Sequence, residues 1–324
     1  MKPRTLVTRL LPPPVMDRLR RETELALEPE DRVFAPAEII AAAAACEALL
    51  PTVTETIDAA VIAAAPRLRV IANFGVGFNH IDVAAATARR IAVTNTPGVL
   101  TEATADIAFG LLIAAARRLG EGERLVRSRA WTGWGPLQLL GHDVAGATLG
   151  LVGFGRIAQA MARRAHGFGM RVLYWSRARR SAADEEKLGV AYRDRDALLA
   201  ESDFVSLHVA YTPDTHHWID AAALARMKPT AVLINTSRGP VVDERALVEA
   251  LRRGAIAAAG LDVFEREPRL EPGLHDLPNC VLLPHLGSAT AGTRTRMGMI
   301  AADNLLAACR GERPPNCVNP AVLD

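Results

Sequence analysis

Short apolar segments with strand character alternate with helical segments along most of the 324-residue chain. One series runs from Thr5 to Thr94, and a second runs from Thr148 to Leu283. In such an alternation each helix returns the chain to the same edge of the sheet, so that successive strands pair in parallel. The sequence therefore predicts an α/β protein with two parallel sheets, and its length suits two domains.

The pattern places the individual elements as follows. In the first series, strands are expected over 5–9, 24–27, 46–50, 69–74 and 91–94, and helices over 15–22, 37–45, 57–65 and 83–90. In the second series, strands are expected over 148–152, 170–175, 204–209, 231–235, 256–261 and 281–283, and helices over 156–166, 195–200, 221–226 and 244–253. A helix over 101–119, ended by Gly120, and a final helix over 290–310 lie at the junctions. Two sheets joined in this way predict two lobes with a ligand cleft between them.

A glycine-rich turn stands between the first strand and the first helix of the second series. Residues 150–158 read Gly-Leu-Val-Gly-Phe-Gly-Arg-Ile-Ala, which contains a GxGxxA pattern. Gly153 permits a tight turn, Gly155 lets the backbone approach a pyrophosphate, and the helix that opens at Arg156 presents free N–H groups. We therefore expect a dinucleotide to bind at this turn, against Gly153, Phe154, Gly155, Arg156 and Ile157.

The end of the next strand bears on which nicotinamide nucleotide binds. An NAD site usually has a carboxylate here, which accepts a hydrogen bond from the ribose 2′-hydroxyl. This chain instead continues from Trp175 with Ser-Arg-Ala-Arg-Arg and has no acid before Asp184. Hydroxyl and guanidinium groups bind a 2′-phosphate, so Ser176, Arg177 and Arg179 favour NADP(H), with NAD(H) as the alternative. The other reading of these arginines is a solvated basic loop.

Three later segments follow predicted strands and contain residues suited to catalysis. Arg238 lies in Asn-Thr-Ser-Arg-Gly-Pro, Glu267 in Leu-Asp-Val-Phe-Glu-Arg-Glu-Pro, and His285 in Leu-Pro-His-Leu-Gly-Ser. Open α/β sheets place their active sites at the carboxyl ends of the strands. We therefore expect the arginine, the carboxylate and the histidine to converge.

On these segments, and on residues 73–82 and 96–101, the chain resembles the D-isomer-specific 2-hydroxyacid dehydrogenases over essentially its whole length. Within that family it looks most like the glyoxylate/hydroxypyruvate reductases. The resemblance implies a Rossmann-type NADP-binding domain over 101–287 and a flavodoxin-like substrate domain formed by 1–100 and 288–324. It also implies site roles: Arg238, Glu267 and His285 as a catalytic triad; Val76, Gly77 and Leu100, with Arg238, around the substrate; and Thr104, Thr236, Asp262, His285 and Gly287 near the nicotinamide.

The resemblance implies the reduction of a small 2-keto acid, glyoxylate or hydroxypyruvate, to the D-2-hydroxy acid, and the residues themselves fit the reduction of a 2-keto acid. The cofactor supplies a hydride, so the protein must supply a proton. His285 suits proton delivery near neutral pH, and Glu267 would stabilise the imidazolium and orient its ring. Arg238 would bind the substrate carboxylate and polarise the carbonyl group.

Other functions stay open at this stage. The triad does not fix the substrate, so a sugar-derived 2-keto acid, a phosphoglycerate-type substrate or phosphite are alternatives. A nicotinamide-sensing regulator that keeps the fold is a further alternative. The chain departs from its relatives at Ala210-Tyr211, where they usually have proline first, and this affects the expected adenosine contact rather than the chemistry.

Composition limits the partners. The 38 basic and 36 acidic residues give a net charge of +2, which argues against nucleic acid or an acidic membrane as a partner. Neither a metal-ligand pattern nor a signal peptide is recognisable, and no apolar run approaches the roughly 18 residues of a spanning helix, so we expect a metal-free cytoplasmic protein. Trp131 and Trp134 lie in a loop before the glycine-rich turn. They predict either local packing or, by preference, an arm that docks on a second subunit of a homodimer.

Overall fold

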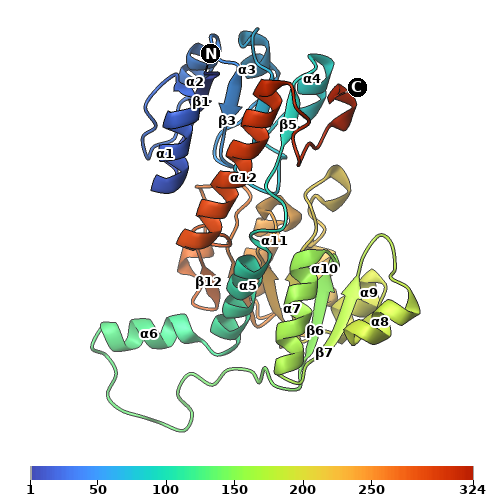
Figure 1. Ribbon diagram of the computed structural model, residues 1–324. Helices are drawn as coiled ribbons and strands as arrows, with labels where there is room; N and C mark the ends of the chain where they lie inside the picture. The colour runs from blue at the N-terminus through green and yellow to red at the C-terminus, as the bar shows by residue number, and fades with distance from the viewer. Residues whose placement is uncertain (1, 324) are drawn as a thin grey trace. The chain divides into compact units, whose positions relative to one another are not determined.

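The computed structural model describes residues 2–323. The chain divides into two compact units, one formed by residues 1–100 with 289–324 and the other by residues 101–288 (Figure 1). Each unit is built on one sheet, and every pair of neighbouring named strands is parallel. The predicted α/β class with two parallel sheets is therefore confirmed.

The first unit has a five-stranded sheet in the order β2-β1-β3-β4-β5, which is the flavodoxin-like order. Its strands are β1 (Arg4–Val7), β2 (Glu24–Leu25), β3 (Ala48–Leu50), β4 (Val70–Ala72) and β5 (Ala92–Thr94). Its helices are α1 (Pro13–Glu22), α2 (Pro36–Ala43), α3 (Ala59–Ala64), α4 (Val83–Ala88) and α12 (Ala291–Arg310), and a 3-10 turn covers Pro320–Leu323.

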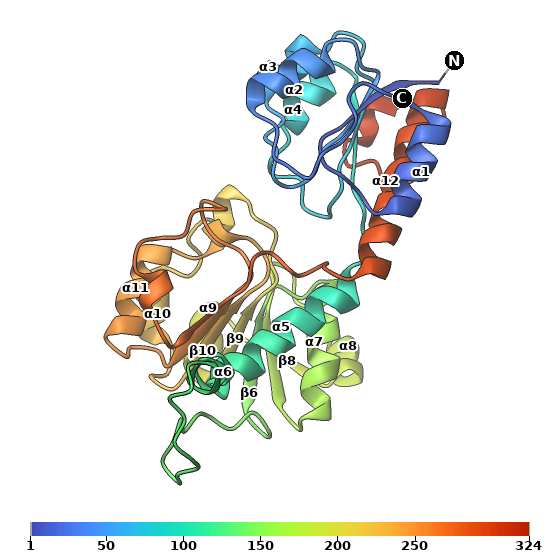
Figure 2. The ribbon, with the colours of Figure 1, turned by 90° about the vertical axis from the view of Figure 1, so that its left-hand side faces the viewer.

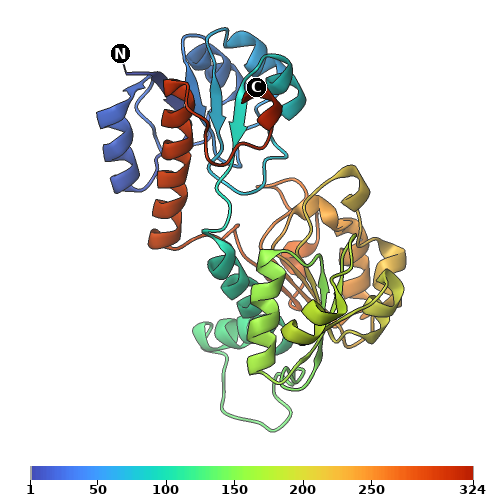
Figure 3. The same cartoon turned by 45° about the vertical axis from the view of Figure 1, so that its right-hand side comes forward.

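Helices cover both faces of this first sheet. Figure 2 shows α2, α3 and α4 on one face, and α1 lies beside α12 on the other, as Figure 3 also shows. Successive strand residues point to opposite faces, and each face has its own buried core. Leu6 and Leu49 pack toward α2 and α3, whereas Val7 and Leu50 pack toward α1 and α12. The strands are apolar on both faces for this reason.

The second unit has a seven-stranded sheet in the order β12-β11-β10-β9-β6-β7-β8. Its strands are β6 (Thr148–Val152), β7 (Arg171–Trp175), β8 (Val190–Tyr192), β9 (Phe204–Leu207), β10 (Val232–Asn235), β11 (Ala258–Leu261) and β12 (Cys280–Leu282). Its helices are α5 (Thr101–Ala116), α6 (Leu119–Arg127), α7 (Arg156–Gly167), α8 (Ala182–Leu188), α9 (Arg195–Glu201), α10 (Ala221–Arg226) and α11 (Glu244–Arg252). Short 3-10 turns cover Pro213–Thr215, Gly239–Val241 and Leu274–Asp276.

The strand order of this second sheet reverses at β6, which has β9 on one side and β7 on the other. Such a reversal is where open α/β sheets bind nucleotides. Helices α5 and α7 cover one face of the sheet, and α10 and α11 cover the other (Figure 2). The glycine-rich turn lies between β6 and α7, directly at the reversal.

The structure differs from the predicted elements at two places. The segment after β7 forms helix α8 and the edge strand β8, where no regular structure was predicted; β8 is only three residues long, too short to give a periodic pattern. The helix predicted over 101–119 breaks earlier than expected. Arg118 takes a left-handed conformation with φ 52°, and the chain then continues through Gly120 as helix α6. Gly120 is therefore inside a helix and does not end one.

Two absences apply to the part of the chain that the structure describes. None of the helices in residues 2–323 is long and apolar enough to cross a membrane. The same residues contain no group of three or more His, Cys, Asp or Glu side chains arranged to hold a metal ion.

The packing of β6 generates a stability prediction. A Cβ added to Gly150 would overlap Ser202 Oγ and would lie 2.9 Å from Leu198 Cδ2, so Gly150→Ala should lower the free energy of unfolding by about 1–3 kcal/mol. Gly110 in α5 has no atom within 4 Å of such a Cβ, and Gly110→Ala should leave stability unchanged or raise it by up to about 1 kcal/mol. Urea denaturation of both variants measures this, and equal stabilities would contradict it.

Candidate active site

Three neighbouring strands deliver the residues predicted to converge. Arg238 follows β10, Glu267 follows β11 and His285 follows β12, and these strands lie side by side in the sheet. Asn235 pairs with Leu261, and Leu261 pairs with Leu282, so the three strands end at nearly the same level. All three side chains thus belong to the second unit and emerge at one edge of its sheet.

His285 and Glu267 form a direct pair. His285 Nδ1 lies 2.9 Å from Glu267 Oε2, and the two side chains are 33% and 34% exposed. The other carboxylate oxygen, Oε1, accepts the backbone N–H of Phe264 at 2.9 Å. Burial raises the pKa of Glu267, but the hydrogen bond and the charge of His285, the Phe264 N–H and the charge of Arg238 together hold it below its usual value. Glu267 is therefore an ionised partner of His285 Nδ1, and the other ring nitrogen, Nε2, takes no part in this contact.

Arg238 lies beside this pair because the turn after β10 touches the loop after β11. A Cβ on Gly239 would overlap the carbonyl group of Phe264, so only glycine permits this approach. Arg238 Nη1 donates to the carbonyl oxygen of Ser237 at 2.7 Å. Burial lowers the pKa of Arg238, and the negative charge of Glu267 opposes that shift. The result is a guanidinium next to the carboxylate of the His–Glu pair.

Asp262 shapes the turn that positions His285. Its side chain is 1% exposed and accepts the backbone N–H of Leu286 at 2.6 Å and of Gly287 at 2.8 Å. Burial raises the pKa of Asp262 despite these two donors and the charge of His285. Thr104 Oγ1 donates to the Gly287 carbonyl oxygen at 3.0 Å, and His285 itself has a left-handed φ of 54°. Thr104, Asp262 and Gly287, predicted near the nicotinamide, therefore also hold the histidine turn.

The turn between β6 and α7 has the geometry that a pyrophosphate requires. Gly153 has φ 86°, and a Cβ there would lie 2.7 Å from the carbonyl oxygen of His208. Around Gly155 no atom lies within 4 Å of such a Cβ, and no side chain caps the amino end of α7. Open space in front of an uncapped helix end is where a phosphate binds. Arg156 and Ile157 form the first turn of that helix.

Two further residues of the second unit also suit a bound nucleotide. Phe154 packs on Tyr174 with ring centroids 4.3 Å apart, which fixes the turn. Thr236, just after β10, is 9% exposed, and its Oγ1 has no hydrogen-bond partner within residues 2–323. A buried hydroxyl without a partner is costly, and a polar group of a ligand would satisfy it. These residues fit a nicotinamide dinucleotide.

The three arginines of the loop after β7 differ in their contacts. Arg179 makes a two-point ion pair with Glu185, with N···O distances of 2.8 and 2.9 Å. The Arg179 and Tyr174 hydrogen bonds lower the pKa of Glu185 to about 2. Arg180 Nη2 donates to the Phe154 carbonyl oxygen at 3.2 Å. Arg177 is exposed and its side chain has no partner within residues 2–323. Its guanidinium group can therefore bind a ligand without breaking another contact.

Ser176, the hydroxyl predicted beside these arginines, is partly buried at the end of β7. Its Oγ donates to the Ala178 carbonyl oxygen at 2.6 Å. The Ser176 oxygen can still accept a hydrogen bond. Its O–H group would have to rotate away from the Ala178 carbonyl oxygen to donate to a phosphate.

The predicted substrate residues Val76, Gly77 and Leu100 lie in the first unit. Val76 and Gly77 follow β4 in a loop held by two asparagines that the sequence argument missed. Asn73 Nδ2 donates to the Gly77 carbonyl oxygen at 3.0 Å, and Asn95 Nδ2 donates to the Val76 carbonyl oxygen at 2.8 Å. Since both carbonyl groups are tied down, the loop has a fixed shape. An asparagine directly after each of two neighbouring strands is the signal that could have identified them.

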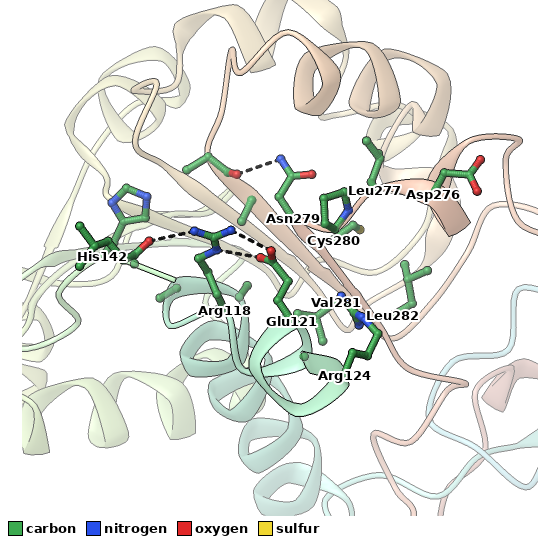
Figure 4. Close-up of a pocket in the computed structure, with 18 of the residues that line it drawn as sticks. Arg118, Glu121, Arg124, His142, Asp276, Leu277, Asn279, Cys280, Val281 and Leu282 are labelled. Carbon is green, nitrogen blue, oxygen red and sulfur yellow. Dashed lines mark hydrogen bonds and ion pairs between the residues drawn. The ribbon is translucent and has the colours of Figure 1, made fainter. Parts of the chain in front are cut away.

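A hollow of about 690 Å³ lies elsewhere in the second unit, between edge strand β12 and the junction of α5 with α6 (Figure 4). Arg118 and Glu121 on its wall form a two-point ion pair with N···O distances of 2.8 Å. His142, Asn279 and Cys280 also line it, and none of the predicted site residues does. This hollow is separate from the strand ends that present Arg238, Glu267 and His285.

A family model matches part of the chain, and known relatives match its full length. A family model described as D-isomer specific 2-hydroxyacid dehydrogenase, NAD binding domain, matches residues 109–287. A protein of Korarchaeum cryptofilum named glyoxylate reductase is 52% identical over 326 residues, which cover 100% of this chain and 98% of the relative. A protein of the same name from Thermococcus litoralis is 48% identical over 327 residues, with the same coverage of 100% and 98%.

A solved structure shares the fold across both units. It is an NADPH-dependent glyoxylate/hydroxypyruvate reductase from Sinorhizobium meliloti in complex with NADP and malonate. It is 37% identical to this chain, with a TM-score of 0.88, and the match covers 100% of this chain and 98% of that one.

Proposed function

The chain belongs to the D-isomer specific 2-hydroxyacid dehydrogenases and is an NAD(P)-dependent oxidoreductase, and we propose that it reduces glyoxylate or hydroxypyruvate to the D-2-hydroxy acid. The observation that supports this reaction best is the pair of His285 Nδ1 and Glu267 Oε2, 2.9 Å apart, with Arg238 beside it. An ionised carboxylate on Nδ1 stabilises the protonated ring and orients it, so that Nε2 can give its proton to the substrate. The names of the full-length relatives support the substrate class.

In the proposed mechanism the protein binds the keto acid and supplies a proton. The nicotinamide, when bound, provides the hydride that goes to the carbonyl carbon. His285 gives its Nε2 proton to the carbonyl oxygen as the new C–H bond forms, and Glu267 stabilises the imidazolium beforehand. Arg238 would bind the substrate carboxylate and polarise the carbonyl group. In the first unit, the backbone N–H groups of Val76 and Gly77 would serve as donors to the substrate carboxylate. Leu100 would limit the size of the substrate.

The cofactor would be held by residues from three places in the second unit. The turn from Gly153 to Ile157 would bind the pyrophosphate at the amino end of α7. Thr104, Thr236, Asp262 and Gly287 would surround the nicotinamide, where the buried Thr236 hydroxyl lacks a partner within residues 2–323. Ser176 and Arg177 would bind a 2′-phosphate, whereas Arg179 would act through its ion pair with Glu185 by fixing the loop.

The triad generates the first functional prediction. His285→Ala or Arg238→Ala should lower kcat/KM for glyoxylate and hydroxypyruvate by at least ~100-fold, because each removes a group that acts in the transition state. His275→Ala, which alters an exposed histidine of the same unit, is the matched control and should keep its activity. Steady-state assays of NADPH oxidation measure this. Near-normal turnover in either triad variant would refute the assignment.

The same assay distinguishes the role of Glu267 by its pH dependence. His285 and the ionised Glu267 stabilise each other's charged forms, as the lowered pKa of Glu267 reflects. Glu267→Gln removes the negative charge, so His285 should lose its proton at a lower pH than in the wild-type protein. In a plot of kcat/KM against pH, the fall on the alkaline side should therefore move to lower pH. An unchanged profile would contradict the pairing.

If the wild-type protein reduces no member of a panel of 2-keto acids, the nicotinamide-sensing alternative replaces the proposal.

We further propose a preference for NADP(H), supported by the free guanidinium of Arg177. A charge-assisted hydrogen bond contributes roughly 1.5–3 kcal/mol, so Arg177→Ala should lower kcat/KM for NADPH by at least ~10-fold and leave NADH little affected. Arg171→Ala is the control, since Arg171 lies at the opposite end of β7 and pairs with Glu201 at 2.9 Å. Use of NADH ten times better than NADPH by wild type would overturn the preference.

We also propose that this cytoplasmic enzyme is a homodimer held by α6 and the arm after it. The arm extends away from the rest of the second unit, and no residue of α6 is buried (Figure 1). Trp134 is 84% exposed and Leu137 80% exposed. Apolar side chains gathered in this way on the surface mark an interface. The hollow beside β12 offers a concave surface for the arm of a second copy.

Light scattering tests the assembly. Wild type should have the mass of two chains, and replacement of both Trp131 and Trp134 by serine should shift the population toward monomer because it removes apolar contact area. Replacement of Trp175, which packs inside the unit against Trp218, would not discriminate, so Val33→Ser, at an exposed apolar residue away from the arm, serves as the control. A monomeric wild type would remove the proposal.

A further inference from the structure

Glu244, the first residue of α11, lies where a glutamate is normally exposed. Acidic residues in the first turn of a helix usually face water and favour the helix dipole. The capping function is already filled, since the Asp243 side chain accepts the Ala246 N–H at 3.0 Å. Glu244 is nevertheless only 3% exposed. A buried carboxylate is costly unless hydrogen bonds stabilise it, so its contacts identify what it does.

The Glu244 carboxylate binds the backbone two residues before Glu267. Its Oε1 accepts the backbone N–H of Glu265 at 2.7 Å. Burial and the charges of Glu265 and Glu271 raise the pKa of Glu244, while the backbone N–H groups of the same two residues oppose the rise. Glu244 thus fixes the start of the 265–271 segment, which contains Glu267.

Further contacts lock the same segment against the turn after β10. Glu265 Oε1 lies 2.9 Å from His217 Nε2, and the backbone N–H of His217 donates to the Pro240 carbonyl oxygen at 2.9 Å. Gly239 leaves no space between this turn and the Phe264 carbonyl group. With Glu265 fixed in this way, Oε1 of Glu267 accepts the Phe264 N–H and Oε2 lies in hydrogen-bond contact with His285 Nδ1.

We propose that Glu244 is a positioning residue of the active site, which holds the 265–271 segment so that Glu267 stays in hydrogen-bond contact with His285. The inference rests on the proposed function of the His–Glu pair and adds a buried residue whose hydrogen bond is to the chain itself. Small displacements of a reacting group lower the rate strongly, up to about 100-fold for a shift of roughly 1 Å. Glu244 therefore acts on the rate through Glu267.

A double-mutant cycle tests this relation. Glu244→Ala should lower kcat by roughly 10- to 100-fold with little change in KM for NADPH, because the cofactor contacts lie elsewhere in the unit. In a Glu267→Gln background the same change should cost less than about 3-fold, since Glu267 can no longer transmit the effect. Glu244→Gln keeps an acceptor for the Glu265 N–H and should recover much of the activity. Glu249→Ala, an exposed glutamate of the same helix that pairs with Arg252, should behave as wild type.

The outcomes separate this role from a general effect on folding. Equal losses in the two backgrounds, or an unchanged kcat in Glu244→Ala, would overturn the proposal. If Glu244→Ala does not fold, Glu244→Met, which fills the same space without a carboxylate, replaces it in both backgrounds, and equal losses there would overturn the proposal likewise. NMR of the His285 Nδ1 proton provides a readout without turnover. Its signal should be protected from water exchange in wild type and in Glu249→Ala, and weakened in Glu244→Ala, even if the proposed substrates fail; unchanged protection in Glu244→Ala would contradict the role.

Discussion

The parallel pairing of β10, β11 and β12 is the constraint on which the site depends. Asn235, Leu261 and Leu282 are register partners along these strands, so the chain leaves the sheet three times at the same edge. Parallel strands need long crossovers, and the crossovers place every following loop on that edge. Arg238, Glu267 and His285 are far apart in sequence but share this edge. The chemistry of the second unit follows from strand register before any side-chain contact is considered.

Buried carboxylates then convert this proximity into fixed geometry. Asp262 accepts two backbone N–H groups from the turn of His285, and Glu244 accepts one from the loop of Glu267. Burial raises the pKa of both acids, which shows that neither position is favourable for an isolated charge. Their backbone donors offset that cost. A hydrogen bond to backbone fixes a loop more firmly than one between two mobile side chains, because the acceptor restrains main-chain dihedrals directly.

Sequence reasoning predicted the strand ends and the glycine-rich turn because their signals are local. The long strands of the second sheet and the GxGxxA turn each lie within a few residues of the pattern that indicates them. The edge strand β8, only three residues long, offers no such pattern, and Arg118 in the left-handed conformation gives no sign that α5 ends before Gly120. The engagement of Arg179 with Glu185 and the burial of Glu244 depend on tertiary packing. The role of a residue that holds another residue in place therefore cannot be predicted from local sequence patterns.

The choice of arginine at position 238 follows from the same burial. Removal from water lowers the pKa of Arg238, and the charge of Glu267 opposes only part of that effect. A lysine ammonium titrates roughly two units below a guanidinium, so equal burial would bring a lysine much closer to neutrality. The proposed task of Arg238 requires a permanent positive charge with two parallel donors for a planar carboxylate, which a guanidinium provides and an ammonium does not. The site can therefore exclude water, which strengthens the interactions between its charges, while Arg238 keeps its positive charge.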